Sequence, residues 1–389
     1  MKVPYHYTRI SQEEHGATAR VLDSDIYYQG PETRGFEEEF AAMCGVRRAV
    51  STNSGSSTLM LILKALGIGQ GDEVIVPAAG FLTVAESVVN VGATPVFVDI
   101  EDETFNMKAD QCEAAITKRS RAVIPIHTYG HPVDMDGLQT IAQKRNVVII
   151  EDCAHAAGAR YKGRRVASIG RCGFFSFAGK SMSVCGMGGM MATDDESLAN
   201  RVMLLRDHGR HRNVGEGWYA FEMVGYNLRL SEIHCAIGRV QVSHLDEWNA
   251  RRRQNAALYT TLLNEAGVPV RPPVVREWAE HAFLHYTTLV PEGQRDPLRK
   301  HLLERGVETG VLYPVPIHLI PPYAQHLGTR PGQFPTSERV CDRILSLPVT
   351  PAITADQIHY TVDQIKAFYA GAGRAAGSEA AAKARGGRA

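Results

Sequence analysis

Short apolar segments alternate with helical segments over the first 150 residues, and this alternation constrains the fold more than any other feature. Four runs have the length and composition of strands, at residues 74–76, 94–98, 122–126 and 147–150. Helical patterns precede or separate them, at residues 35–45, 54–66, 83–89 and 135–145. Such alternation predicts βαβ units and a mostly parallel sheet in an α/β fold. Because the strands are apolar throughout, we expect helices on both faces of the sheet.

The length of the chain predicts two domains. A chain of 389 residues exceeds the usual size of one domain, so we expect a large α/β domain and a smaller domain after it. A long charged helical stretch from Ser231 to about Asn264 leads out of the large domain. We place the large domain at residues 1–250, the small domain at 251–370, and a disordered tail at 371–389, where only Ala, Gly, Ser and charged residues occur.

Charge and cysteine usage argue against several classes of protein. Lys plus Arg and Asp plus Glu both number 42, so the chain has no overall attraction for nucleic acids or anionic membranes. No apolar run reaches the length of a membrane span, and the first residues lack the apolar core of a signal peptide. The seven cysteines form no C-x-x-C pair, which fits a reducing compartment. We therefore expect a cytoplasmic protein that binds no metal, nucleic acid or membrane.

A pair of carboxylates, Glu151 and Asp152, ends the last of these four strands. Ligands of open α/β sheets bind beyond the carboxyl ends of the strands. Asp152 is therefore a candidate to hold a cationic group of a ligand, such as a protonated ring nitrogen. Capping of the next turn is the plainer role for it when this segment is taken alone.

A lysine and a serine-rich helix start are two further candidate sites. Lys180 lies in a loop of small residues after an aromatic strand, where desolvation favours the neutral amine that forms a Schiff base. Gly55, Ser56 and Ser57 begin an apolar helix, whose free N–H groups and dipole bind phosphate. Taken singly, a lysine in a loop is usually a solvated charge. A serine at the start of a helix is usually a helix cap. Together with Asp152, these groups match the needs of pyridoxal 5'-phosphate (PLP).

Seven motifs, in order, resemble those of the DegT/DnrJ/EryC1/StrS family, the sugar aminotransferases of PLP fold type I. The motifs are GPETRGFEEEF, NSGSSTL, GDEVIVPAAGF, YGHPVDMD, EDCAHAAGA, LRDHGR and VGYNLRLSE. The resemblance extends from about Gly30 to Asn249, with weaker matches to about Pro351. It implies a mostly parallel sheet of the seven-stranded type in the large domain and an α+β fold for the small C-terminal domain.

The resemblance implies roles for the residues around the cofactor ring. Lys180 would form the Schiff base and move protons at the substrate carbon. Asp152 would pair with the pyridine nitrogen, and His155 would lie beside the ring near its phenolic oxygen. Phe81 would stack on the ring face.

It also implies which residues hold the phosphate and the substrate. Ser56, Ser57 and Ser176 would bind the phosphate, with Gly55 in the same loop. Asn227 would reach the phosphate from the other subunit, which implies a homodimer with shared active sites. Tyr313 and His318, in the segment YPVPIHL, match more weakly a part of the family that lies near the substrate.

Three features depart from the family pattern. Three residues separate Ser176 from Lys180 where the family has four, which weakens the phosphate role of Ser176. Ala79 and Gly80 replace larger residues, which predicts a wider pocket near the ring. Met187 stands where an acidic residue is common.

Two further histidines, His127 and His131, flank a tyrosine in HTYGHP. A metal site needs more than two such ligands, and we expect no acidic or cysteine partner to complete one with these two histidines. We interpret both as polar lining of the pocket.

The implied activity is the transfer of an amino group from glutamate or glutamine to a keto sugar or a keto cyclitol. For the keto sugar, we favour a nucleotide-linked form. Such reactions belong to aminosugar, aminocyclitol or antibiotic biosynthesis. Dehydratases of the same family carry histidine at the lysine position, so Lys180 argues against that activity. An enzyme that forms an aromatic amine, like aminohydroxybenzoate synthase, and a non-catalytic PLP-binding regulatory protein remain as alternatives. The presence of Lys180, Asp152 and His155 together favours catalysis.

Overall fold

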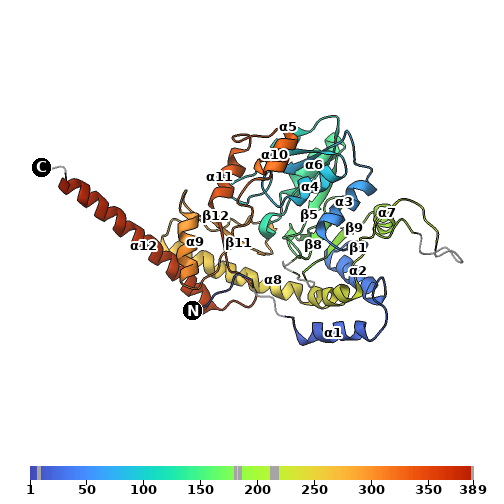
Figure 1. The fold of residues 1–389 in the computed structure, drawn as a ribbon, viewed down its shortest axis with the longest axis horizontal. Coiled ribbons are helices and arrows are strands. Elements are labelled where there is room, and N and C mark those ends of the chain that lie inside the picture. The colour runs from blue at the N-terminus through green and yellow to red at the C-terminus, as the bar shows by residue number, and fades with distance from the viewer. Residues whose placement is uncertain (7–9, 179–181, 183–185, 211–218, 387–389) are drawn as a thin grey trace.

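The computed structural model describes residues 1–6, 10–178, 182, 186–210 and 219–386. Its helices are α1 (Gln12–Leu22), α2 (Pro31–Cys44), α3 (Gly55–Ala65), α4 (Thr83–Asn90), α5 (Ala109–Ala115), α6 (Met135–Arg145), α7 (Glu196–Arg206), α8 (Glu232–Ala266), α9 (Arg295–Glu304), α10 (Pro321–Leu327), α11 (Pro335–Arg343) and α12 (Ala355–Gly386), with 3₁₀ turns η1 (Thr128–Gly130) and η2 (Ile317–Leu319). Figure 1 shows how they surround the sheets.

A mostly parallel sheet forms the centre of the large domain. In the described part of the chain it has seven strands, in the order β1-β9-β8-β5-β4-β2-β3. Only β9 runs against its neighbours among these strands, because its pairs with β1 and β8 are antiparallel and the other pairs are parallel. The strands are β1 (Arg48–Thr52), β2 (Glu73–Pro77), β3 (Thr94–Val98), β4 (Ser120–Val123), β5 (Val148–Asp152), β8 (Cys172–Ser176) and β9 (Gly189–Thr193). The predicted sheet is thus confirmed.

Helices cover both faces of this sheet, as the apolar strands predict. Successive residues of a strand point to opposite faces. In β2, Val74 and Val76 therefore pack in the same core as α3, whereas Ile75 packs in the core that contains α6. One face carries α3, α4 and α7, and the other carries α2, α5, α6 and the first half of α8.

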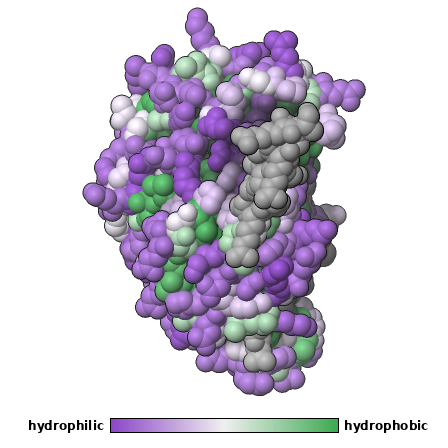
Figure 2. All heavy atoms as spheres, turned by 90° about the vertical axis from the view of Figure 1, so that its left-hand side faces the viewer, coloured by the Kyte–Doolittle hydropathy of each residue, from purple (hydrophilic) through white to green (hydrophobic). Residues whose placement is uncertain are grey.

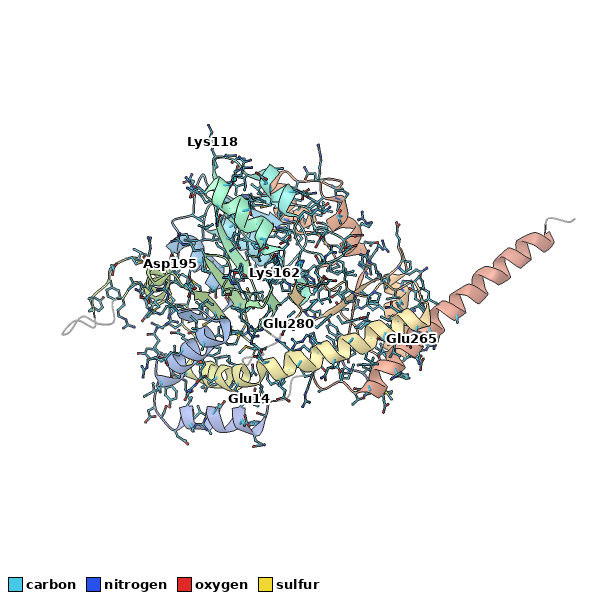
Figure 3. All side chains as sticks on the ribbon, turned by 180° about the vertical axis from the view of Figure 1, so that it is seen from behind. Glu14, Lys118, Lys162, Asp195, Glu265 and Glu280 are labelled. Carbon is cyan, nitrogen blue, oxygen red and sulfur yellow. The ribbon has the colours of Figure 1, made fainter. Side chains whose placement is uncertain are left out.

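The helix α8 connects the two domains. Ser231 caps its start, and Gly267, with a φ of 62°, ends it. It packs against α1 and α2 near its start and against α12 near its end. Figure 1 shows it along the base of the molecule, and Figure 3 shows it from behind, with Glu14 of α1 beneath its start and Glu265 near its end.

The small domain is built around an antiparallel pair of strands, β11 (Tyr286–Leu289) and β12 (Ile344–Leu347). Its core contains apolar residues of α8, α9 and α12. Three short strands form a separate sheet in the order β10-β6-β7, and they are β6 (Arg160–Tyr161), β7 (Arg164–Arg165) and β10 (Ala279–Glu280). The face of the molecule in Figure 2 is mostly hydrophilic, with apolar residues in small groups.

Several segments cross the domain boundaries that the sequence suggested. Val3 pairs with Val307 and lies in the core of the small domain, and Ile317 lies in the core of the large sheet. The helix α12 continues through residues 371–386, where composition alone predicted disorder. This stretch is rich in alanine, the residue with the highest helix propensity. The boundaries at residues 250 and 370 remain predictions.

The helix α1 was not predicted, although its start carries a recognisable signal. Ser11 and Glu14 form a capping box, in which each side chain accepts a hydrogen bond from the other residue's backbone N–H. Among the described helices, none combines the length and the apolar character that crossing a membrane requires.

Candidate active site

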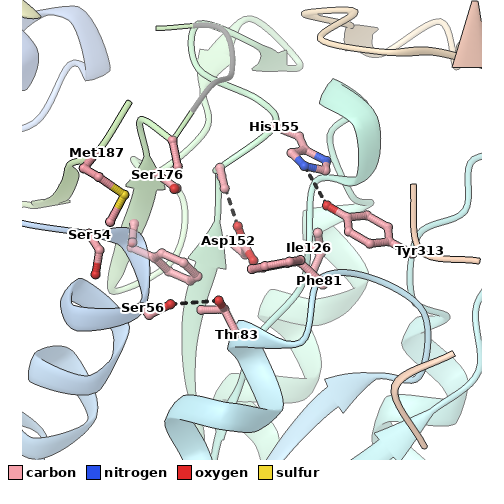
Figure 4. Close-up of a pocket in the computed structure, with 14 residues that line it drawn as sticks. Ser54, Ser56, Phe81, Thr83, Ile126, Asp152, His155, Ser176, Met187 and Tyr313 are labelled. Atoms are coloured by element: carbon pink, nitrogen blue, oxygen red, sulfur yellow. Dashed lines mark hydrogen bonds between the residues drawn. The ribbon is translucent and has the colours of Figure 1, made fainter. Parts of the chain in front are cut away.

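A cavity of about 300 Å³ lies at the carboxyl edge of the sheet, beyond the ends of β5 and β8 (Figure 4). This edge is where ligands bind in open α/β sheets. Segments that are far apart in the sequence supply its lining, which consists of Ser54, Gly55, Ser56, Phe81, Thr83, Ile126, Asp152, Ala154, His155, Phe174, Ser176, Ala178, Met187 and Tyr313. The fold therefore brings together most of the described residues that the sequence singled out.

Asp152 is the last residue of β5, and only 5% of it is exposed. Its Oδ1 accepts a hydrogen bond of 3.0 Å from the backbone N–H of Ala154. Burial raises the pKa of this carboxyl to about 6, although the Ala154 bond and the nearby His127 act in the opposite direction. A cationic group in the cavity would stabilise the ionised form. Asp152 is thus suited to a protonated ring nitrogen.

Glu151, the preceding residue, points to the other side of the strand and is fully buried. Its oxygens accept hydrogen bonds from three backbone N–H groups, those of Ala167, Ile169 and Gly170, at 2.6–2.9 Å. His127 Nε2 lies 3.0 Å from the same carboxylate. Glu151 therefore holds the turn after β7 in place and does not face the cavity.

His155 is fixed by hydrogen bonds at both ring nitrogens. The backbone N–H of Tyr129 donates to Nδ1 at 3.3 Å, and Nε2 lies 2.8 Å from the hydroxyl oxygen of Tyr313. Because Nδ1 accepts from an N–H group, the proton of the neutral imidazole belongs on Nε2 and points to the Tyr313 oxygen. The hydroxyl hydrogen of Tyr313 is then available to another acceptor. Tyr313 was a weak prediction, and the structure places it in the cavity wall.

The start of α3 forms a second wall of the cavity. Ser54 caps the helix and accepts a hydrogen bond from the Ser57 N–H, and the first N–H groups of a helix lack partners within it. The hydroxyl of Ser56 lies 2.9 Å from that of Thr83. Gly55 is required here, because a Cβ on it would lie 2.7 Å from the Cβ of Ser176. This wall offers N–H and hydroxyl groups to an anion.

Phe81 lies at the mouth of the cavity and is 53% exposed. Its ring centroid is 6.1 Å from that of Tyr313. The neighbouring residues Ala79 and Gly80 are not among the residues that line the cavity, and the expectation that they widen it stays a prediction. Gly80 has a φ of 149°, and a side chain there would collide with Ile126. Its small size therefore reflects the backbone conformation.

Some predicted residues do not reach the cavity within this chain. The hydroxyl of Ser57 turns to that of Ser54, at 2.8 Å. His318 is fully buried elsewhere, with Nε2 at 3.2 Å from Glu338 Oε1. Asn227 is exposed on a segment whose backbone pairs with Asp207. Lys180 lies outside the described residues, but Ala178 and Met187, on either side of that segment in the sequence, both line the cavity.

Sequence reasoning missed Thr83 and Ile126 in the cavity wall. Thr83 was expected only as the first residue of a helix, and Ile126 only as the end of a strand. The signal for both was their position in the segments that follow strands β2 and β4, at the edge where ligands bind.

The histidines His127 and His131 are buried in the protein and do not line this cavity, so the interpretation of them as its lining is wrong. His127 Nδ1 accepts a hydrogen bond from the Val133 N–H, and His131 Nδ1 donates to the Pro132 carbonyl at 2.6 Å. Burial lowers the pKa of His131 to about 4.

Three possible metal ligands, in His127, Glu151 and Cys153, lie within 4.8 Å of one another. They do not suit a metal ion. The Glu151 oxygens are engaged by backbone N–H groups, and burial raises the pKa of the Cys153 thiol well above its usual value, so that the thiolate needed for ligation is disfavoured.

Comparison with known proteins identifies the family. A model of the DegT/DnrJ/EryC1/StrS aminotransferase family matches residues 8–366. The chain belongs to this family. It is therefore an aminotransferase, and three of its family motifs, NSGSSTL, GDEVIVPAAGF and EDCAHAAGA, supply residues of the cavity wall.

Relatives in this family are similar over nearly the whole chain. The dTDP-3-amino-3,4,6-trideoxy-alpha-D-glucose transaminase of Streptomyces venezuelae is 42% identical over 364 residues, which cover 92% of this chain and 93% of that protein. The solved structure of S. venezuelae DesV in complex with a ketimine intermediate has a TM-score of 0.89 and 40% identity, over 94% of this chain and 98% of that one. A putative sugar aminotransferase of Streptococcus pneumoniae, solved in its PLP-form, has a TM-score of 0.88 and 27% identity, over 95% and 98%. The fold is thus that of PLP-dependent aminotransferases.

Proposed function

We propose that this aminotransferase binds PLP through Lys180 and transfers an amino group from glutamate or glutamine to a nucleotide-linked keto sugar or a keto cyclitol. The observation that carries the proposal is the buried carboxylate of Asp152 in a cavity that also receives the start of α3. The name of the S. venezuelae relative supports a nucleotide-linked sugar as the acceptor.

The residues present fit PLP at both ends of the molecule. Asp152 would pair with the ring nitrogen, and its burial strengthens the attraction between the two charges. The N-terminus of α3, with Ser56 and Thr83, would bind the phosphate. Ser176 lies against Gly55 at the same wall, which supports a phosphate role for Ser176 in spite of the shortened spacing to Lys180.

When bound, PLP supplies an electron sink and a carrier for the amino group. The side chains of this protein hold the charges and the protons around it. Asp152 would keep a proton on the ring nitrogen by favouring the cationic form. His155 is fixed by Tyr129 and Tyr313, and it would present one tautomer to the ring. The Lys180 amine would move the proton at the substrate carbon.

This proposal includes a homodimer with shared active sites. It also includes a location of the protein in the cytoplasm. Asn227 is exposed and does not line the cavity of its own chain. A second copy related by two-fold symmetry would bring its Asn227 to the phosphate wall, and the same contact would then complete both sites.

A substrate screen tests the function directly. Purified protein is incubated with glutamate or glutamine and with nucleotide-linked keto sugars or keto-inositols, and amino products are detected by mass spectrometry. Turnover of one of these acceptors supports the proposal. Formation of an aminohydroxybenzoate from a cyclic ketone precursor, or bound PLP with no transfer from either donor to any acceptor, contradicts it.

A further inference from the structure

The first residues of the chain are tied to the small domain by backbone hydrogen bonds. Val3 is fully buried, its N–H donates to the Gly306 carbonyl at 2.8 Å, and its carbonyl accepts from the Glu308 N–H at 2.9 Å. Two residues further on, the Tyr5 N–H donates a hydrogen bond to the Glu308 carboxylate at 3.0 Å. The Tyr5 side chain is thereby directed into the protein.

Tyr5 makes a specific contact with His285, 280 residues away in the sequence. Its hydroxyl lies 2.8 Å from His285 Nδ1, and the two rings stack with centroids 6.0 Å apart and planes at 9°. Burial raises the pKa of Tyr5, so the phenol stays protonated, and its hydroxyl and Nδ1 share one hydrogen bond whose direction follows the tautomer of His285. Gly310 leaves room for the tyrosine, because a side chain at that position would collide with its ring.

His285 in turn packs against the residues that hold His155. It is 2% exposed, and its ring meets the His155 ring edge to face, with centroids 5.2 Å apart and planes at 81°. It meets Tyr129 in the same way, at 6.0 Å and 87°. Its backbone N–H also donates to the Tyr129 carbonyl at 3.4 Å. A change in the orientation of the His285 ring must therefore alter the packing of the His155 ring.

We propose that Tyr5 and His285 are positioning residues, which keep His155 in its working orientation without themselves lining the cavity. The hydrogen bond between Tyr5 and His285 restrains rotation of the His285 ring, and the edge of that ring sets the tilt of His155. The N-terminal segment thus takes part in the reaction from outside the cavity. The inference rests on the proposed function, because it assigns His155 a place beside the bound PLP.

Four variants test this coupling in the full-length protein: Tyr5→Phe, His285→Leu, the double variant, and Tyr360→Phe as a matched control. The control removes another hydroxyl hydrogen bond of the small domain, from Tyr360 to the Arg305 carbonyl at 3.0 Å. For each variant we would measure the melting temperature, the affinity for PLP, the absorbance spectrum of the bound cofactor, and kcat and KM.

We expect Tyr5→Phe to lower kcat and PLP affinity by about threefold to tenfold, the range expected for one lost hydrogen bond, with KM for the amino donor unchanged. The double variant should lose no more than His285→Leu alone, because both changes interrupt the same contact. The absorbance maximum should shift in Tyr5→Phe and in His285→Leu, and Tyr360→Phe should match the wild type in every measurement except melting temperature.

Additive losses in the double variant would overturn the inference, as would a Tyr5→Phe protein with unchanged kcat, PLP affinity and spectrum. If His285→Leu does not fold, the Tyr5→Phe measurements decide the matter alone. A wild-type protein that binds no PLP would instead contradict the proposed function, so the two failures can be told apart.

Discussion

Replacing Asp152 with asparagine removes the charge of the buried carboxyl and preserves its size. In the cofactor-free protein, burial raises the pKa of Asp152 from 3.8 to about 6. The folded protein therefore binds this proton more tightly than the unfolded chain does, and the stability that the protonated form contributes is lost as the pH rises from about 4 through 6. The rise in pKa corresponds to about 3 kcal/mol at most. Above pH 6, cofactor-free Asp152→Asn should be more stable than the wild type by up to this amount.

Bound PLP should reverse the sign of this effect. A protonated ring nitrogen stabilises the carboxylate, and asparagine cannot replace its charge. A hydrogen bond between charged groups contributes about 1.5–3 kcal/mol, so kcat of Asp152→Asn should fall by about 10- to 150-fold. The same substitution would thus stabilise the cofactor-free protein and impair the loaded enzyme.

Denaturant unfolding of the cofactor-free proteins at pH 4, 5, 6 and 7, together with kcat of the loaded enzymes, tests both parts. Glu151→Gln is the matched control, because its amide leaves at least one of the three backbone N–H groups without an acceptor, at a cost of about 1–3 kcal/mol. It should lose stability at every pH and keep most of its kcat per folded molecule. The reasoning is refuted if the stability difference between wild type and Asp152→Asn does not change with pH, or if both variants lose kcat equally.

Three further predictions concern the cofactor and the assembly. Lys180→Ala should lose the absorbance of the lysine–cofactor adduct, and borohydride reduction of the wild type followed by peptide mapping should label Lys180; a label on another lysine would disprove the assignment. Mixing Lys180→Ala with Asn227→Ala protomers should restore part of the activity, since one site of each mixed dimer carries neither change; mixed dimers confirmed by tag pull-down that stay inactive would refute the shared site. Gly55→Ala should weaken PLP affinity, because the new Cβ forces Ser176 to move. A cost of about 1.4 kcal/mol for this movement corresponds to a tenfold loss of affinity. An unchanged affinity in a titration would show that this wall does not hold the phosphate.

The sheet could be predicted because its strands carry their own signal. Runs such as residues 94–98 are apolar on both faces, and β3 occupies that range in the structure. Helix α6 also matches its predicted bounds, from Met135 to Arg145. The helix α1 was missed because few of its residues are apolar, and only its capping box marks it. Local pattern thus predicted β3 and α6, but it gave no strand at β1 or β9, although both are largely buried.

Residues of the site could be predicted only where the end of one strand or the start of one helix determines that a side chain faces the ligand. Asp152 ends a strand and Ser56 starts a helix, and each faces the cavity as expected. His318 lies only five residues after Tyr313, yet its ring turns to Glu338 and Phe334, away from the cavity. No local pattern distinguishes the two residues, because the packing of distant segments decides which one faces the ligand.

The backbone around His155 is strained at the two residues that hold its ring. Tyr129 and Tyr313 have φ angles of 56° and 65°, in the left-handed region, where a bulky residue costs about 1–3 kcal/mol. Their rings lie within 12° of parallel to the His155 ring. The Tyr129 N–H and the Tyr313 hydroxyl are the groups that bond its two nitrogens, so the strained conformations coincide with the contacts that fix its orientation and tautomer. Tyrosine has no preference for this backbone conformation, so contacts with neighbours must maintain it, such as packing of Tyr129 against Phe105 and His285 and the hydrogen bond from the His285 N–H to the Tyr129 carbonyl. This dependence on packing explains why a residue outside the cavity can influence His155.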